Sequence, residues 1–434
     1  HEASVENIAL STGLKVWFNP ANEKYYRMFL ASGTLSAFSK TTFVDRFRGL
    51  TGQTIDVSDV DEITHVFKPQ INAEFYKDET TGLEHYNEFK RTSAMNHYLT
   101  TKAEGAKCPP FLDLLVSNVF PHPLHRELFE HNLAYHLKYL VPCMTAIISI
   151  GKTQGTGKNT LYDGLLGAIY GEGKYYLSWK SSKFTGDFNG DLKNKLCVHG
   201  NDIKEVITSN TASTINNTAK TMIGGWPLSV TAKGKETENI ENHLFVVMSS
   251  NESKPFTVDE GDNRRYNVFP TSTHKLEEIY PAIKTMNKLQ ITALINEELH
   301  QYLDYLTTIP LSSEMWSKTI NTAQKEVMVG KSTPSAHKIA QALLDKDMEV
   351  LEEECEESFI DFYKHEILDL NISYIKTATL KEYMPNQRKK ITDYLKASGV
   401  EHGIQNLPRD KKSSAVYIIN PEGTKQEELS YAKL

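Results

Sequence analysis

The chain has 434 residues, of which 39% are hydrophobic and 24% charged, a balance that excludes disorder as the default state and leaves room for two or three domains. Its 48 lysine and arginine residues stand against 55 aspartate and glutamate residues, so the formal charge is −7. The molecule as a whole therefore offers no positive field that would attract nucleic acid. Any contact with DNA must depend on local basic patches.

The cysteine count and the hydropathy pattern restrict the compartment. Four cysteines without CxxC spacing exclude a disulfide-rich secreted scaffold and fit a reducing cytoplasm, that of the host cell if the protein is viral. No apolar run reaches the ~18 to 20 residues that span a bilayer, and the N-terminus lacks a signal-peptide pattern. We therefore expect a soluble protein. Because the chain begins with His1 rather than methionine, we interpret it as a processed chain or a fragment of something longer.

The hydrophobic pattern changes several times along the chain. The first hundred residues mix short aromatic runs with turn residues. Loosely helical spacing follows between Pro110 and Leu140, and Pro121 and Pro123 predict a break between two helices. From 144 to 270, apolar runs of strand length alternate with helical stretches and glycine-rich turns, which is typical of an α/β domain with a parallel sheet. We predict four parts: a mixed α/β segment (1–105), a core with a helical lead-in over 106–143 (106–275), a helical region (276–365) and a winged-helix-like domain (366–434).

A glycine-rich loop follows the first strand of the predicted core. Met144–Ile150 is a β-branched strand, and the loop after it leads into a helical pattern that ends at Tyr170. Glycines allow successive backbone N–H groups to face phosphates, and the N-terminus of the next helix adds partial positive charge. Lys158 would then reach the β- and γ-phosphates. The pattern predicts a nucleotide-binding loop made of Gln154, Gly155, Thr156, Gly157, Lys158, Asn159 and Thr160.

This loop departs from the usual G-x-x-x-x-G-K-[ST] pattern in two ways. The leading glycine is displaced by one position, and Asn159 occupies the position whose hydroxyl group normally binds Mg²⁺. The Asn159 amide or the Thr160 hydroxyl would have to take its place.

Two further strands end in polar residues. The strand from Leu196 ends at Asn201-Asp202, and an ATPase needs such a carboxylate to hold Mg²⁺ and polarise water. Asp202 is therefore our candidate for the catalytic carboxylate and a Mg²⁺ ligand, with Glu205 as a helper; a capping aspartate at an ordinary strand end is the alternative. The strand His243–Ser250 ends at Asn251, placed to orient water or to sense the γ-phosphate, although a simple turn asparagine fits the same pattern.

A pair of arginines follows in the segment Asp262-Asn-Arg264-Arg265. An arginine that reaches the γ-phosphate in a neighbouring subunit stabilises charge in the transition state. The alternative is a surface ion pair.

In this order, the sequence elements resemble those of superfamily 3 helicases of the phage and poxvirus primase-helicase type, and in particular the helicase half of phage primase-polymerase proteins. The elements are Gln154–Asn159, Asn201-Asp202, Lys233-Gly-Lys235, Ser249–Asn251 and Asp262–Arg265.

The resemblance is specific over about 110 to 270. It implies an AAA+ P-loop fold, a hexameric ring with ATP and Mg²⁺ at the subunit interfaces, and single-stranded or forked DNA as partner. A primase or polymerase domain would precede this chain. By this likeness Lys158 is the Walker A lysine, Asp202 the Walker B acid, Asn251 the sensor, and Arg264 or Arg265 the arginine finger.

Two basic segments are candidates for DNA contact. Lys233 and Lys235 lie at the tip of a predicted hairpin that lines the central channel in the resembling family, with a merely exposed hairpin as the alternative. In the winged-helix-like domain the basic residues follow a layout that contacts phosphates, although a packing or oligomerisation module would share that fold. These residues are Arg388, Lys389 and Lys390 on the second helix and Arg409, Lys411 and Lys412 in the following hairpin.

Two other functions compete with a helicase motor. One is a P-loop ATPase that remodels proteins or packages DNA. The other is an origin- or RNA-binding module whose altered loop holds nucleotide only as a structural ligand, which the asparagines at 159 and 201 would favour. The histidines at 122, 125, 131 and 136 have uneven spacing and no cysteine partners, so we interpret them as surface and packing residues rather than metal ligands.

Overall fold

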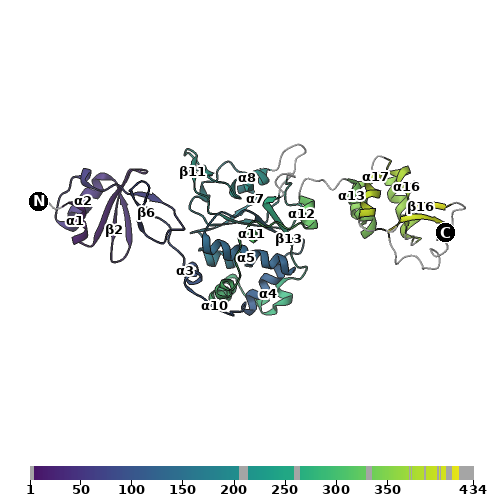
Figure 1. Ribbon diagram of the computed structural model, residues 1–434, viewed down its shortest axis with the longest axis horizontal. Coiled ribbons are helices and arrows are strands. Elements are labelled where there is room, and N and C mark those ends of the chain that lie inside the picture. The colour runs from purple at the N-terminus through teal and green to yellow at the C-terminus, as the bar shows by residue number, and fades with distance from the viewer. Residues whose placement is uncertain are drawn as a thin grey trace. The chain divides into compact units, whose positions relative to one another are not determined.

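The structure is a computed structural model, and it describes residues 4–204, 214–258, 264–328, 335–370, 372, 374–385, 388–397, 400, 402–406 and 413–419. The chain divides into two compact units, one of residues 1–256 with 264–320 and one of 257–263 with 321–434 (Figure 1). Within the described ranges no helix has both the length and the apolar character that crossing a membrane requires.

The N-terminal segment contains two small sheets. The first is an antiparallel meander in the order β1-β2-β3, and the second has the order β4-β6-β5. Trp17 is fully buried and its indole N–H donates to Nε2 of His65 over 3.0 Å, which ties the two sheets together. The elements are α1 (Val5–Ser11), β1 (Leu14–Asn19), β2 (Lys24–Phe29), β3 (Thr34–Phe38), α2 (Lys40–Thr51), η1 (Val57–Asp59), β4 (Thr64–Val66), β5 (Phe75–Lys77) and β6 (Glu84–Asn87).

The centre of the first unit is a five-stranded sheet in the order β13-β7-β12-β9-β8, and every neighbouring pair is parallel. The three inner strands are almost wholly buried, as expected for parallel strands that are covered on both faces. Because all strands run the same way, their carboxyl ends meet at one edge. The strands are β7 (Ala146–Ile150), β8 (Tyr176–Lys180), β9 (Cys197–Asn201), β12 (Phe245–Ser250) and β13 (Tyr266–Pro270).

Helices cover both faces of this sheet. Figure 1 shows α4, α5 and α10 below it and α7 and α8 above it. The two helices predicted on either side of Pro121 are present as α4 (Pro110–Val119) and α5 (Pro123–Tyr139). The other elements of this unit are α3 (Ser93–Thr100), η2 (Thr160–Leu166), α6 (Gly167–Tyr170), α7 (Ser181–Phe184), η3 (Gly190–Leu192), α8 (Thr214–Met222), β10 (Leu228–Val230), β11 (Glu238–Ile240), α9 (Leu276–Ile279), η5 (Pro281–Thr285), α10 (Lys288–Thr307) and α11 (Ser313–Trp316).

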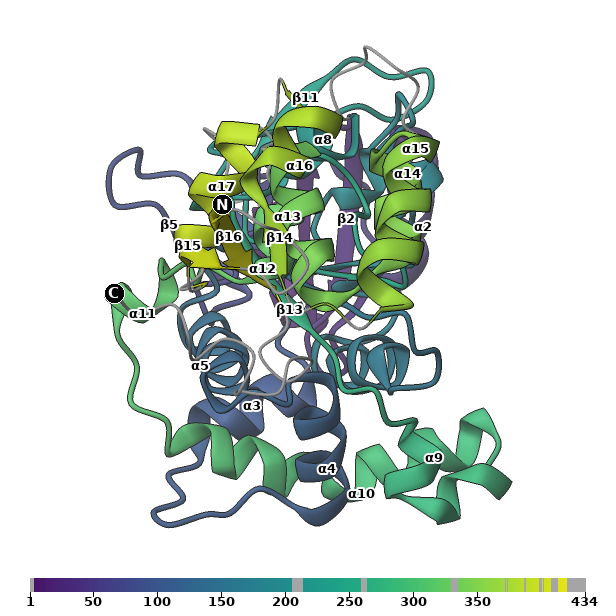
Figure 2. The same cartoon turned by 90° about the vertical axis from the view of Figure 1, so that its right-hand side faces the viewer.

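The second unit combines helices with a three-stranded antiparallel sheet in the order β14-β16-β15. Helix α13 packs between α14 and α17 (Figure 2). The helical region expected over 276–365 is thus divided: α9 to α11 belong to the first unit, and α13 to α15 to the second. The elements are α12 (Ala323–Met328), α13 (Ser335–Asp345), α14 (Met348–Glu354), α15 (Glu357–Phe362), η6 (Tyr363–Leu368), β14 (Tyr374–Lys376), α16 (Thr377–Tyr383), α17 (Arg388–Ala397), β15 (His402–Asn406) and β16 (Ser413–Ile418).

Candidate nucleotide site

The glycine-rich loop leaves the carboxyl end of β7 and passes directly into a helix that begins at Lys158. Gly155 and Gly157 have positive φ angles of +81° and +101°, which residues with a side chain rarely adopt. A Cβ atom on Gly157 would also lie 2.7 Å from Cδ1 of Leu115. The helix is π-helical over Thr160–Leu166, a wider winding that is frequent at functional sites.

Two contacts from other elements fix the shape of the loop. Asn118 of α4 donates from Nδ2 to the carbonyl oxygens of Thr156 over 2.8 Å and His274 over 2.9 Å. The N–H of Leu276 donates to the carbonyl oxygen of Gly155 over 2.8 Å. The loop is therefore held on both sides by segments distant in sequence, and its carbonyl groups are used in these contacts.

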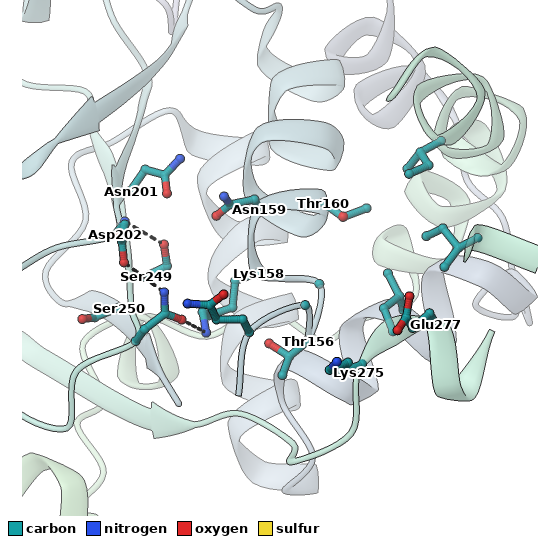
Figure 3. A pocket seen from close by; sticks show the side chains of 17 residues that line it. Thr156, Lys158, Asn159, Thr160, Asn201, Asp202, Ser249, Ser250, Lys275 and Glu277 are labelled. Carbon is teal, nitrogen blue, oxygen red and sulfur yellow. Dashed lines mark hydrogen bonds between the residues drawn. The ribbon is translucent and has the colours of Figure 1, made fainter. Parts of the chain in front are cut away.

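A cavity of about 660 Å³ lies at this edge of the sheet (Figure 3). All seven residues predicted for the nucleotide-binding loop line it, together with Asp202 and Asn251. Asn201, Ser249 and Ser250, which belong to the motifs named above but were not predicted as site residues, line it as well. The remaining lining residues carry no signal in the sequence; they are Lys275, Leu276, Glu277, Ile283 and Ile291.

Lys158, Asn251 and Asp202 form one chain of hydrogen bonds in the cavity. Nζ of Lys158 donates to Oδ1 of Asn251 over 3.0 Å, and Nδ2 of Asn251 donates to Oδ1 of Asp202 over 3.1 Å. The Lys158 side chain is buried, and this burial lowers the pKa of its ammonium group while the nearby Asp202 carboxylate opposes the change. Nζ also donates to the Gly151 carbonyl over 3.3 Å, so both of its hydrogen-bond partners are neutral. A buried cation with neutral partners and a carboxylate farther away has capacity for an anionic ligand.

Asp202 stands at a sharp turn directly after β9. Its φ angle of +51° lies in the left-handed region, where aspartate is tolerated better than most residues. Its N–H donates to Oγ of Ser249 on the adjacent strand over 3.4 Å, and the next residue, Ile203, donates its N–H to the Ser249 carbonyl over 2.8 Å. The turn therefore holds the carboxylate at the cavity rather than along the strand.

A buried polar network supports this turn from behind. His199 of β9 is fully buried; its Nε2 lies 2.9 Å from Oγ of Ser249, and its Nδ1 lies 2.8 Å from Oδ1 of Asp163. Burial acts to raise the pKa of Asp163, but the contacts with His199 and Tyr176 outweigh it and the pKa is lowered overall. Asp163 therefore carries a negative charge near neutral pH, one helical turn beyond Lys158.

The predicted Mg²⁺ ligands lie on different sides of the helix. Asn159 lies on the side that faces Asn201 and Asp202, whereas Thr160 extends on the side of Glu277 (Figure 3). Amide and carboxylate oxygens are the hard ligands that Mg²⁺ prefers. Among the described residues no group of three His, Cys, Asp or Glu side chains could hold a metal ion. One carboxylate with two amides fits a cation that takes most of its ligands from phosphates and water.

The part of the cavity beyond the loop is different in character. Leu276, Ile283 and Ile291 supply apolar side chains there, and the aliphatic part of the Lys275 side chain lies beside Gly155. An apolar wall next to a phosphate-binding loop suits a base or another flat ring. No local pattern marked these residues in the sequence, because they follow β13 and join the site only through the fold.

Arg264 and Arg265 directly precede β13 and lie at the amino ends of the strands, opposite the carboxyl ends that carry the cavity. Tyr266, the next residue, pairs with Ala146 at the start of β7, while the glycine-rich loop follows Ile150 at its end. A strand of this length spans roughly 15 Å. Neither arginine lines the cavity of its own chain. Asp262 and Asn263 from the same motif, and the candidate helper Glu205, lie outside the described residues.

Lys233 and Lys235 flank the turn of a two-stranded antiparallel hairpin, β10 and β11, and both are exposed. The hairpin is held along β10 by Asn189, whose side chain donates to the Ser229 carbonyl over 3.0 Å and accepts from the Thr231 N–H over 2.7 Å. The basic tip therefore projects from a fixed stalk.

The other predicted DNA-binding residues lie on α17. Lys389 and Lys390 are exposed and Arg388 is half-buried, while Ile391 and Leu395 point into the core of the second unit. The predicted hairpin residues Arg409, Lys411 and Lys412 lie outside the described residues.

The four histidines before the loop do not converge on one site. Nε2 of His136 lies 2.8 Å from the His243 carbonyl, and Nε2 of His131 accepts from the Ser312 N–H over 3.0 Å. His122 caps α5, and His125 stacks on Phe269. They are capping and packing residues.

Known proteins resemble this chain over most of its length. It is 27% identical over 347 residues to the DNA primase-polymerase of Nitratiruptor phage NrS-1, a match that covers 79% of this chain and 45% of that protein. The chain thus spans less than half the length of that relative. A family model described as a family of unknown function (DUF5906) matches residues 149–265, the segment from the end of β7 to the residue before β13.

Solved structures of the NrS-1 C-terminal region share the fold. An apo structure has a TM-score of 0.62 at 22% identity and covers 96% of this chain and all of its own. A second apo form has a TM-score of 0.60 at 23% identity and covers 95% of this chain and 98% of its own. The chain is therefore a mixed α/β protein with a parallel sheet, homologous to the C-terminal part of a phage primase-polymerase.

Proposed function

We propose that the chain is the ATP-hydrolysing motor of a replication helicase that moves along single-stranded DNA as a ring, in a phage or plasmid primase-helicase. The observation that carries the proposal is the hydrogen-bonded chain from Lys158 through Asn251 to Asp202 in a cavity closed by a glycine-rich loop. These are the groups that phosphoryl transfer requires: a cation and backbone amides for the phosphates and a carboxylate near the attacking water.

Each residue has a definite task in this proposal. The loop amides and Lys158 bind the β- and γ-phosphates, and Asp202 orients the attacking water and accepts its proton. Asn251 keeps the lysine and the carboxylate apart and in register while it contacts both. Mg²⁺, bound with ATP on the side of Asn159 and Asp202, would neutralise phosphate charge.

The position of the arginines supports an oligomer. Arg264 and Arg265 lie at the amino edge of the sheet, opposite the cavity of their own chain. An arginine finger from these residues can therefore serve only the site of another subunit, as a ring with head-to-tail interfaces allows. We propose a homo-oligomeric ring, a hexamer by resemblance.

The hairpin supports DNA as the substrate. Its exposed lysines, Lys233 and Lys235, project from an anchored stalk and would grip phosphates. In the second unit, the order β14, α16, α17, β15, β16 and the exposed lysines of α17 support a winged helix that would contact the DNA backbone. The homology to a phage primase-polymerase supports a role beside priming or synthesis in the host cytoplasm.

The test compares Lys158→Ala with Lys152→Ala. Lys152 is exposed in the same loop but does not line the cavity. We expect wild type and Lys152→Ala to release phosphate from ATP faster with single-stranded DNA and to displace a strand from a forked substrate. Lys158→Ala should lose both activities. Normal hydrolysis by Lys158→Ala would refute the site, and DNA-stimulated hydrolysis without strand displacement would favour remodelling or packaging over unwinding.

A further inference from the structure

Asp163 lies behind the cavity and is fully engaged by its neighbours. Its Oδ1 accepts from the hydroxyl of Tyr176 over 2.7 Å and lies 2.8 Å from Nδ1 of His199. Its Oδ2 accepts from Nδ2 of Asn201 over 3.2 Å. Asp163 does not itself line the cavity, but Asn201 does. Asn201 is therefore the cavity-lining side chain with which Asp163 has a direct hydrogen bond.

The chemistry of this contact determines which end of the Asn201 amide faces Asp163. An ionised carboxylate only accepts hydrogen bonds, so it must be met by the NH₂ group of the amide and not by its oxygen. The Asn201 oxygen is left for the cavity side, where Asn159 and Asp202 stand (Figure 3). With Asp163 in place, Asn201 thus presents an acceptor rather than a donor to the cavity.

His199 fixes the carboxylate in turn. The Asp163 carboxylate only accepts, so Nδ1 of His199 is the donor to it. Nε2 of His199 lies 2.9 Å from the Ser249 hydroxyl, which accepts the Asp202 N–H. The imidazole of His199 is fully buried and so is shielded from water. One continuous network therefore ties the orientation of Asn201 to the turn that carries Asp202.

We propose that Asp163 is a positioning residue that aims the Asn201 oxygen at the divalent cation of the bound nucleotide. The proposal rests on the proposed function, because it assumes that a nucleotide with its cation occupies this cavity. The usual acidic pair has an acid at the position of Asn201. Here the negative charge is on Asp163, which lies behind Asn201 and acts through the Asn201 amide. Asn201 is then a ligand rather than a defect.

Two near-isosteric variants test this assignment. In Asp163→Asn, the new oxygen can still accept from Tyr176 and His199, so its NH₂ group faces Asn201. Two NH₂ groups cannot hydrogen-bond to each other, so the Asn201 amide turns round and presents donors to the cation. Adding Asn201→Asp restores the pair in reverse, with an amide donating to a carboxylate whose second oxygen faces the cavity.

The measurement is the affinity for the fluorescent nucleotide mant-ADP, in MgCl₂ and in EDTA, with the full chain. We expect Asp163→Asn to weaken binding in MgCl₂ by about 10- to 100-fold, the usual effect of losing a group that orients a metal ligand. Binding in EDTA should match wild type, and the double variant should recover the MgCl₂ affinity. Asp187→Asn, the same change at an exposed carboxylate outside the cavity, should behave as wild type.

The outcomes separate this proposal from the proposed function. Equal loss of affinity in MgCl₂ and EDTA, or no recovery in the double variant, would mean that Asp163 serves only the fold and would overturn the positioning role. Full Mg²⁺-dependent affinity in Asp163→Asn would overturn it as well. Undiminished binding by Lys158→Ala would instead refute the nucleotide site itself, independently of Asp163.

Discussion

Asn251, at the end of β12, donates from its amide to the carboxylate of Asp202, at the end of β9, over 3.1 Å. The same amide accepts from Lys158 over 3.0 Å. This double contact is possible because β12 lies between the strand that leads to the loop and the strand that carries the acid. The residue that follows the central strand thus supplies an amide that hydrogen-bonds both the ammonium group and the carboxylate.

We expect Asn251→Ala to lower the rate of ATP hydrolysis by about 10²-fold, the usual effect of removing one polar group that acts in the transition state. Nucleotide affinity should change only a few-fold, because Lys158 and the loop amides remain. Steady-state kinetics with a separate mant-ADP titration would show this division. Asn217→Ala, an exposed asparagine of α8, is the matched control. Loss of affinity equal to the loss of rate would contradict a role specific to hydrolysis.

The hairpin predicts a change in salt dependence. Each lysine that contacts a phosphate of single-stranded DNA contributes about 0.7 to the slope of log affinity against log salt concentration. Replacing both Lys233 and Lys235 with alanine should therefore reduce that slope by about 1.4 and weaken binding at low salt. Fluorescence anisotropy with a labelled oligonucleotide at several salt concentrations measures both. Replacing Lys284 and Lys288 with alanine removes two exposed lysines elsewhere and controls for net charge. An unchanged slope in the hairpin variant would remove the hairpin from the DNA path.

The arginine at the far edge of the sheet predicts complementation between inactive subunits. Arg264→Ala should lower hydrolysis by about 10³-fold, because no other subunit then stabilises the transition state. Lys158→Ala should be inactive for a different reason. In a 1:1 mixture that exchanges subunits, about a quarter of the interfaces would combine an intact lysine with an intact arginine. We expect the mixture to recover measurable ATPase activity, and a mixture as inactive as its components would exclude a finger acting between subunits.

The strands and the loop of the core could be predicted because their signals are local. A β-branched run before Gly151 and an apolar run before Asn251 each correspond to an observed strand, β7 and β12. The order of the strands has no such signal, since it depends on pairing between segments a hundred residues apart. The sequence therefore indicated polar strand ends but not that Asn251 would stand between Lys158 and Asp202.

The residues that the sequence analysis missed share one property. Asn118 contacts the loop from 38 positions upstream, and Asp163 contacts Asn201 across 38 positions. Lys275 and the apolar wall come from the segment after β13. Each of these side chains is ordinary for its own helix or turn, and its role depends on tertiary packing. The sequence shows Asn201 only as a departure from the usual acid. The carboxylate that contacts it, Asp163, lies on a different element and could not be related to it from the sequence.

A buried histidine predicts the response of the fold to acid. His136 is fully buried in α5; Nδ1 lies 2.7 Å from the Tyr170 hydroxyl and Nε2 lies 2.8 Å from the His243 carbonyl. Only the Nε2–H can donate to that carbonyl, so Nδ1 accepts from Tyr170 and the ring is neutral. Burial lowers the pKa of His136 to about 4 from an ordinary value of 6.5.

Because the folded pKa of His136 lies below the unfolded one, the unfolded state binds a proton first as the pH falls. The resulting contribution to stability is complete above pH 6.5 and is lost progressively toward pH 4, by about 3 kcal/mol in total. Denaturant unfolding at pH 7.5, 5.5 and 4.5 measures the slope. His136→Gln should be less stable at every pH but should show a shallower acid slope, and His274→Gln, which removes an exposed imidazole, is the matched control. An acid slope that is unchanged in His136→Gln would contradict the prediction, because it would show that this imidazole has the same pKa in the folded and unfolded states.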